Sequence, residues 1–136
     1  MELRTSWRRG PAKSRGPILV SVTDFTGTAR DLPRIYRAGL ELRRAWPDLE
    51  GAVGLWLWTR PLQRRSGSVS IWTTEADLHR FVAWPPHVAI MRRFRHRGRI
   101  RAHTWEVDHF DPGQIWARAH QLLDAQPEAP SHTESR

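Results

Sequence analysis

Residues 52–73 carry the sequence AVGLWLWTRPLQRRSGSVSIWT, in which two alternating segments flank a polar turn. The alternation predicts strands over residues 52–60 and 68–73, because successive side chains of a strand point to opposite faces. Residues 61–67 contain Pro, Gln, Arg, Ser and Gly, which are typical of a turn. This stretch therefore predicts two consecutive strands joined by a short connection.

The flanking sequence switches between helical and strand periods. The expected elements are a strand over 18–23, a helix from Asp31 to about Trp46, a helix from Glu75 to about Trp84, a helical segment from His87 to about Arg97, a strand over 99–110 and a helix over 112–125. Asp31, Thr74 and Asp111 are expected to begin helices, and Pro47 and Pro85-Pro86 to end them. The order β-α-β-β-α-β plus a helix predicts an α+β, ferredoxin-like fold with both crossover helices on one face of the sheet.

Composition limits the remaining possibilities. Residues 1–16 are predicted to be a disordered basic arm, residues 17–125 the domain, and residues 126–136 a disordered tail. The chain has no cysteine, which excludes disulfides and thiolate chemistry. It has no apolar run long enough to span a membrane and no secretory signal, so a cytoplasmic location is expected.

Eight tryptophans are many for 136 residues. Sorting strand residues by parity gives an aliphatic set, which helices would cover: Ile18, Val20, Val22, Val53, Leu55, Leu57, Val69, Ile71, Ile100 and Ala102. The opposite set mixes four tryptophans with polar groups: Leu19, Ser21, Thr23, Gly54, Trp56, Trp58, Arg60, Ser68, Ser70, Trp72, Arg101, His103, Trp105 and Val107. Such a face is too apolar for water, which predicts a tryptophan-lined cavity, a homodimer through the open sheet face, or both.

Residues 70–81, SIWTTEADLHRF, followed by His87 and Met91-Arg92-Arg93, resemble the antibiotic-biosynthesis monooxygenase superfamily of dimeric α+β-barrel proteins. More narrowly, they are similar to its spheroidene-monooxygenase-like and DUF3291-like members. The resemblance covers about residues 17–110. It implies a ferredoxin-like protomer that binds its substrate between sheet and helices.

The same resemblance implies roles for individual residues. Quinone-forming members of the superfamily need no cofactor and use an Asn with Trp residues, and haem-degrading members use Asn, Trp and a His ligand. Trp72 or Trp84 corresponds to the Trp and His87 to the His, but this sequence contains no Asn. Ser21 or Thr23 is the hydrogen-bonding group that could stand in its place.

The candidate site follows from these two arguments. His87 and His103 are the candidate catalytic residues, because histidine can move a proton near neutral pH. The candidate substrate-binding residues are Ser21, Thr23, Trp56, Trp58, Trp72, Trp84, Arg101 and Trp105. Arg60 and Arg101 could hold an anionic group. No residues have the spacing of a metal site, unless His87 binds haem iron.

Three functions remain open. The first is a monooxygenase-like or cyclase-like tailoring enzyme that needs no cofactor and acts on an apolar polycyclic or polyene metabolite. The second is a haem-binding protein with His87 as the axial ligand. The third is a nucleic-acid binder that uses the arginine-rich run 92–101, although the sheet lacks the aromatic motif of RNA-recognition domains.

Overall fold

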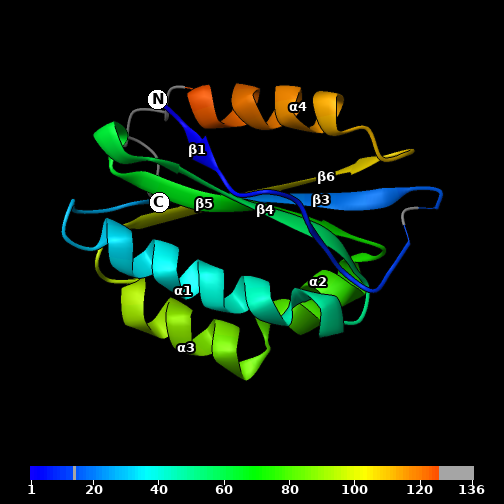
Figure 1. Ribbon diagram of the computed structural model, residues 1–136, viewed down its shortest axis with the longest axis horizontal. Helices are drawn as coiled ribbons and strands as arrows, with labels where there is room; N and C mark the ends of the chain where they lie inside the picture. Colours follow the sequence, from blue (N-terminus) through cyan, green and yellow to red (C-terminus); the bar gives the residue numbers. More distant parts are fainter. Residues whose placement is uncertain (14, 126–136) are drawn as a thin grey trace, which may run out of the picture.

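The computed structural model describes residues 1–13 and 15–125, which form three layers (Figure 1). A six-stranded antiparallel sheet has the order β1-β4-β5-β3-β6, with β2 also paired to β4. The strands from β3 to β6 keep the order of a ferredoxin-like sheet, so the predicted α+β fold class is confirmed.

The sheet consists of β1 (Leu3–Arg4), β2 (Arg8–Arg9), β3 (Ile18–Thr26), β4 (Ala52–Arg60), β5 (Arg65–Trp72) and β6 (Arg99–Val107). The helices are α1 (Leu32–Ala45), α2 (Glu75–Val82), α3 (Pro85–Phe94) and α4 (Pro112–Asp124), with 3-10 turns at Trp46–Asp48 and Pro61–Gln63. None of these helices is long and apolar enough to cross a membrane.

The helix boundaries follow from local chemistry. The Thr74 hydroxyl accepts the Asp77 N–H at 3.1 Å, and the Asp111 carboxylate accepts the Gln114 N–H at 3.2 Å. Each bond satisfies a donor that the first helical turn leaves free. Asp31 precedes α1 as expected, but its side chain makes no capping bond. Pro85 begins α3 and so separates it from α2.

The strand register assigns each side chain to a face, because directly paired residues of an antiparallel sheet share a face. Ser68 pairs with both Thr23 and Leu57, and these residues point toward α1, α2 and α3. Val69 pairs with Val22 and Trp56, and these point toward α4. We call the two sides the α1–α3 face and the α4 face.

Relative to β3, the parity sets expected from sequence hold for β5 but are wrong for β4 after its bulge and for β6. Ile100 and Ala102 of β6 pair with Phe25 and Thr23 and lie on the α1–α3 face, opposite Val20 and Val22. Leu55 and Leu57 lie on the α1–α3 face with the serines of β5, whereas Val69 and Ile71 lie on the α4 face. A bulge between Ala52 and Gly54 contributes to the error, because it inserts one residue and reverses the parity of everything after it.

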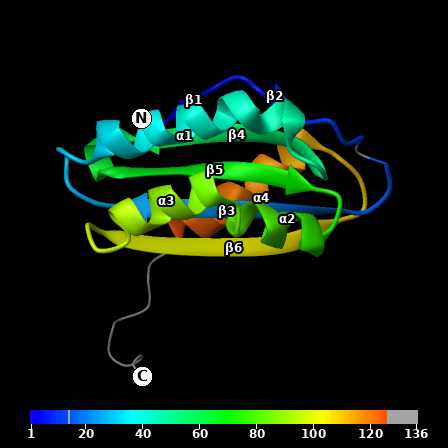
Figure 2. The same ribbon diagram turned by 90° about the horizontal axis from the view of Figure 1, so that it is seen from below.

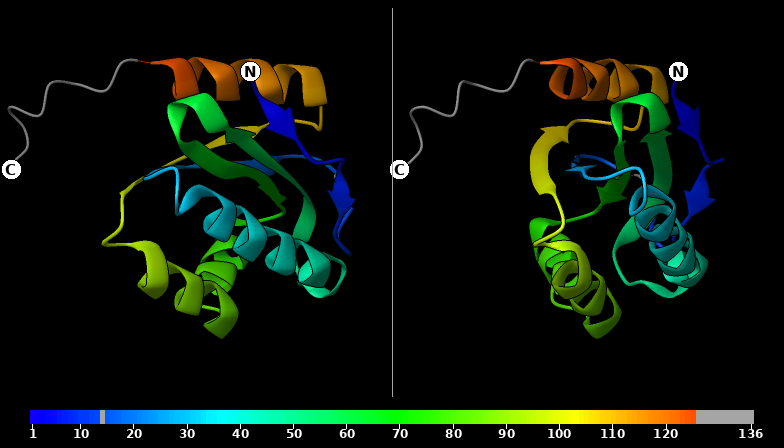
Figure 3. Two further views of the ribbon diagram at one scale, coloured as in Figure 1. Left: turned by 60° about the vertical axis from the view of Figure 1, so that its left-hand side comes forward. Right: turned by 90° about the vertical axis from the view of Figure 1, so that its left-hand side faces the viewer.

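The α4 face is not open. Figure 3 shows α4 lying across the sheet on the side opposite α1, α2 and α3. Its buried residues Ile115, Trp116, Ala119 and Leu123 join Trp56 and Trp58 in one apolar cluster. The expectation of an uncovered tryptophan face is therefore wrong, and the homodimer inferred from it stays a prediction without that support.

The N-terminal segment differs from the expected disordered arm. Strands β1 and β2 both pair with β4, and Trp7 packs on Trp56 with ring centroids 4.3 Å apart. Burial disfavours the charged form of Glu2, but hydrogen bonds from Arg4, His120 and Arg60 outweigh this and lower its pKa to about 2. The predicted disordered tail, residues 126–136, lies outside the described residues.

Gly54 leaves the space that Trp7 of the N-terminal segment occupies, because a Cβ at this position would overlap the Trp7 ring. Gly54→Ala should therefore lower the free energy of unfolding by about 1–3 kcal/mol, the usual cost of overpacking. Urea unfolding measures the loss, and limited trypsin digestion measures release of Arg4, Arg8 and Arg9. Gly113→Ala is the matched control, since its Cβ would meet only the Asp111 carboxylate, at 3.5 Å. Identical behaviour of both variants would contradict this role of Gly54.

Candidate functional site

A cavity of about 350 Å³ lies between the α1–α3 face of the sheet and the three helices over it. Figure 2 looks onto these helices, with β6 along the margin of the sheet. The walls are mainly apolar: Ile35, Tyr36, Leu42 and Trp46 from α1 and its end, Leu55 and Leu57 from β4, and Leu78, Phe81, Ile90 and Met91 from α2 and α3. A concave apolar site of this kind suits a small organic ligand.

The sheet supplies a wall of hydroxyl groups to this cavity. Ser21 and Thr23 of β3 lie beside Ser68 and Ser70 of β5. The Thr23 and Ser68 hydroxyl oxygens are 2.7 Å apart, and the Trp72 indole N–H donates to Ser70 Oγ at 2.9 Å. The Ser21 hydroxyl makes no side-chain hydrogen bond with any described residue, so it is available to a polar group of a ligand.

His87 is the histidine best placed for proton transfer. Its Nδ1 lies 3.1 Å from the Val82 carbonyl oxygen, which can only accept, so Nδ1 carries the proton and Nε2 is left as an acceptor. The ring packs on Phe81 with centroids 4.6 Å apart. Burial lowers the pKa of His87 below its usual value, against the opposing effect of the Val82 carbonyl. The imidazole is therefore neutral at pH 7 and can accept a proton.

The cavity borders the β6 edge of the sheet. Ala102 and Thr104 of β6 line it and are nevertheless exposed. His79 of α2 also lines it, but most of its ring is in solvent and lies 3.7 Å from Glu75. A ligand can thus reach the interior without passing the packed centre of the sheet.

The structure brings together some of the residues predicted from sequence. Ser21, Thr23 and His87 line the cavity. Trp72 is fully buried behind the wall, in edge contact with Trp46 at 5.2 Å between centroids. Trp84 precedes α3 and lies 6.1 Å from Phe81 between ring centroids, outside the lining.

The other predicted residues lie on the α4 face, so their grouping with His87 in one cavity is wrong. Trp56, Trp58 and Trp105 belong to the apolar cluster beneath α4. His103 pairs with Val22 on that face, and Arg101 donates to the buried Asp24 carboxylate at 2.9 Å. The sheet separates all five from the cavity, which makes a direct contact with its ligand impossible in this arrangement.

Several lining residues were not among the candidates from sequence. Tyr36 and Leu42 of α1 and Trp46, just after its end, form an apolar stripe, and a stripe at helical spacing is equally typical of a core. Parity placed Ser68 and Ser70 on the predicted cavity face without naming them as binding residues, and Ser66 continues the same row of small hydroxyl residues along β5.

Haem does not fit this lining well. His87 could supply an axial ligand through Nε2, but no Arg or Lys of residues 1–13 or 15–125 lines the cavity to pair with the two propionates. No group of three or more His, Asp or Glu that could hold a metal occurs in the described residues. The nucleic-acid alternative also loses its basis, because α4 covers the tryptophans on which bases would stack.

Comparison with known proteins supports the fold. No protein-family model matches the sequence, and no curated protein matches it either. Among solved structures, a candidate antibiotic biosynthesis monooxygenase from Deinococcus radiodurans aligns with a TM-score of 0.61 at 11% identity, covering 68% of this chain and 95% of its own.

Two further structures are similar. SnoaB, a cofactor-independent oxygenase from Streptomyces nogalater, aligns with a TM-score of 0.53 at 16% identity over 70% of this chain and 97% of its own. An uncharacterized ferredoxin-fold protein related to antibiotic biosynthesis monooxygenases, from Listeria monocytogenes, aligns with a TM-score of 0.60 at 13% identity over 79% of this chain and 63% of its own. The chain thus has the ferredoxin-like fold of the antibiotic-biosynthesis-monooxygenase-like proteins, as its sequence resemblance predicts.

Proposed function

We propose that this protein is a monooxygenase-like tailoring enzyme that binds a neutral, largely apolar small molecule in the cavity on the α1–α3 face. The observation that carries the proposal is one neutral histidine, His87, in an apolar cavity with a wall of hydroxyls. The fold likeness to SnoaB, an oxygenase without a cofactor, supports the same class of chemistry.

The arrangement favours a flat substrate with polar groups along one edge. Apolar walls exclude water from the substrate body, and the Ser21 hydroxyl can bond a carbonyl or hydroxyl on its edge. His87 Nε2 would take a proton from an acidic C–H or O–H group. The electron-rich carbon left behind could then react with dioxygen. For a CH₂ group, one oxygen atom enters as C=O and the other leaves as water.

Anthrone, a neutral tricyclic ketone with an acidic CH₂ group, is a suitable first probe. Its binding should quench tryptophan fluorescence, since Trp46 lines the cavity. Oxygen consumption above the rate without protein should accompany its conversion to the quinone.

A blocking variant tests the location. Ala102→Phe places a large side chain at an exposed lining position of β6 and should weaken anthrone binding about tenfold or more, because it occupies space the ligand needs. Ala117→Phe, at an exposed position of α4, is the matched control and should bind normally. Failure of anthrone and of related neutral tricyclic or polyene compounds to bind would overturn the proposed function. Equal affinity of both variants for anthrone would show that anthrone does not bind in the cavity on the α1–α3 face.

A further inference from the structure

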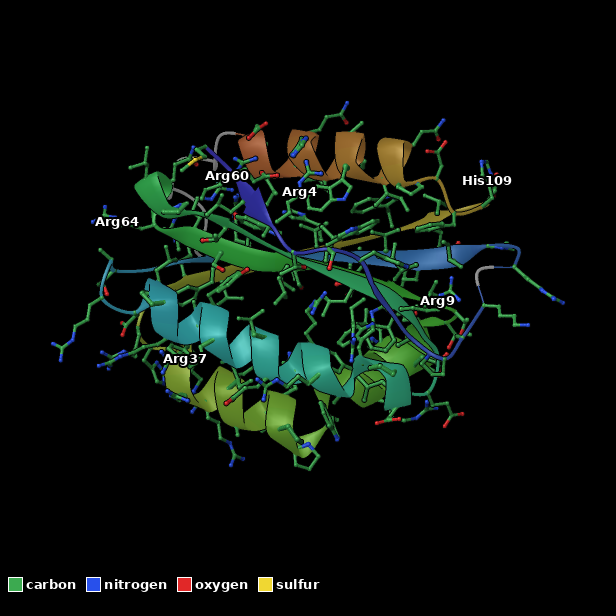
Figure 4. All side chains as sticks on the ribbon, viewed as in Figure 1. Arg4, Arg9, Arg37, Arg60, Arg64 and His109 are labelled. Carbon is green, nitrogen blue, oxygen red and sulfur yellow. The ribbon has the colours of Figure 1, made fainter. Side chains whose placement is uncertain are left out.

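A second hollow, of about 470 Å³, lies on the α4 side at one end of the sheet. It is formed where β3 ends and β6 begins, beside the β4–β5 connection and the end of α4. Its charged and polar lining includes Thr26, Arg60, Arg65, Arg99, Arg101 and Asp124, and we call it the arginine hollow. Figure 4 shows Arg60 and Arg64 at this end of the molecule.

Three carboxylates form ion pairs with three of these arginines. Arg60 pairs with Glu2 at 3.0 Å and with Asp124 at 2.7 Å. Asp24 is almost wholly buried and accepts from Arg65 at 2.7 Å and from Arg101 at 2.9 Å. A buried carboxylate that holds two guanidinium groups fixes their orientation, as an outer partner fixes a metal ligand. The four arginines of the lining face three carboxylates, one of which, Glu2, also pairs with Arg4, so at least one positive charge is left in excess.

The unused donors are concentrated on β6. Among the described residues, Arg101 makes one side-chain hydrogen bond, through Nη2, and these residues do not engage its other N–H groups. Arg99 makes no side-chain hydrogen bond or ion pair with any described residue. The two arginines are two residues apart on one strand, so both point to the same face about 7 Å apart. Thr26 pairs directly with Arg99 and adds a hydroxyl.

We propose that the arginine hollow binds the phosphate group of a small molecule, at a site separated from the α1–α3 cavity by the sheet. Arg99, Arg101 and the Thr26 hydroxyl can together satisfy three oxygens, which a tetrahedral phosphate offers and a carboxylate does not. Guanidinium groups match phosphate geometry through paired N–H donors. The proposal does not depend on the activity of the cavity.

Isothermal titration of the full chain with inorganic phosphate tests the site at constant ionic strength, and a 5′-mononucleotide and acetate are titrated in parallel. We expect phosphate binding that weakens with added salt, as charge pairing at a surface requires. Saturation by the mononucleotide alone would assign the phosphate to a larger ligand. Acetate binding as tight as phosphate, or no binding by either phosphate compound, would overturn the proposal.

Arg99→Gln is the decisive variant, because Arg99 has no described partner whose loss could unfold the protein. It should weaken phosphate binding about tenfold, the effect expected for one charged hydrogen-bonding group. Arg92→Gln removes the same charge from the exposed surface of α3 and is the matched control. Equal loss in both variants would show general attraction to a basic protein and would overturn the site.

Discussion

Trp58→Ala should lower the free energy of unfolding by about 3–5 kcal/mol, the range for removing a large aromatic side chain from a core. Trp58 is fully buried on the α4 face, between the sheet and α4. Its indole N–H has no hydrogen-bond partner among the described residues, and the Arg60 and Arg65 guanidinium groups are 5.8 and 5.9 Å from its ring centroid, so the loss comes mainly from packing. This is a large part of the 5–15 kcal/mol that stabilises a typical domain.

Urea unfolding followed by circular dichroism measures this effect. Trp58→Phe is the control, because it retains a ring and should cost clearly less than the alanine variant. Binding of anthrone per folded molecule should be unchanged in Trp58→Phe, since the sheet lies between position 58 and the cavity. A Trp58→Ala protein that stays stable but no longer binds anthrone would contradict this core role and show that Trp58 contacts the ligand.

The order of strands and helices could be predicted from the sequence because each element carries its own local signal. Strand and helix periods differ, and Thr74, Pro85 and Asp111 mark helix starts in ways that depend on neighbouring residues alone. Boundaries were less accurate. β5 begins at Arg65 and β3 continues to Thr26, because cross-strand hydrogen bonds extend pairing into residues with no apolar alternation.

The faces of the sheet could not be predicted in the same way. Parity divides one strand into two sets, but it does not say which set of the next strand lies on the same side. The bulge between Ala52 and Gly54 changes that relation for Leu55 and Trp56. The docking of α4 and of the N-terminal strands depends on contacts such as Trp7 on Trp56, which join residues far apart in sequence.

For the candidate site, sequence identified the groups with distinctive chemistry. Ser21, Thr23 and His87 were singled out and do line the cavity. The apolar walls were not, because a residue such as Leu42 is equally suited to a core and to a ligand cavity. Only the assembled layers distinguish the two, because they leave a cavity of about 350 Å³ between the helices and the sheet.

His87→Gln should lower the rate of anthrone oxidation about 100-fold, the lower end of what a general base contributes. Glutamine keeps a similar size and can still donate a hydrogen bond, but it has no basic nitrogen to replace His87 Nε2. His79→Gln is the matched control, because His79 also lines the cavity but is mostly exposed. Its activity should stay within about twofold of the wild type, an effect below 0.5 kcal/mol.

The pH dependence tests the same residue through its charge. Burial lowers the pKa of His87, so the neutral, proton-accepting form should persist below pH 6.5, the usual pKa of histidine. Oxidation should therefore fall on the acid side with an apparent pKa below 6.5, and this limb should be absent in His87→Gln. The free energy of unfolding should also fall toward acid pH. Between the lowered pKa and 6.5 the unfolded chain binds more protons at this position than the folded chain, so the protein loses stability as pH falls through that window. Melting temperatures at pH 7.5 and 5.5 should thus differ more for the wild type than for His87→Gln. An acid limb that persists unchanged in His87→Gln would assign the proton transfer to another group.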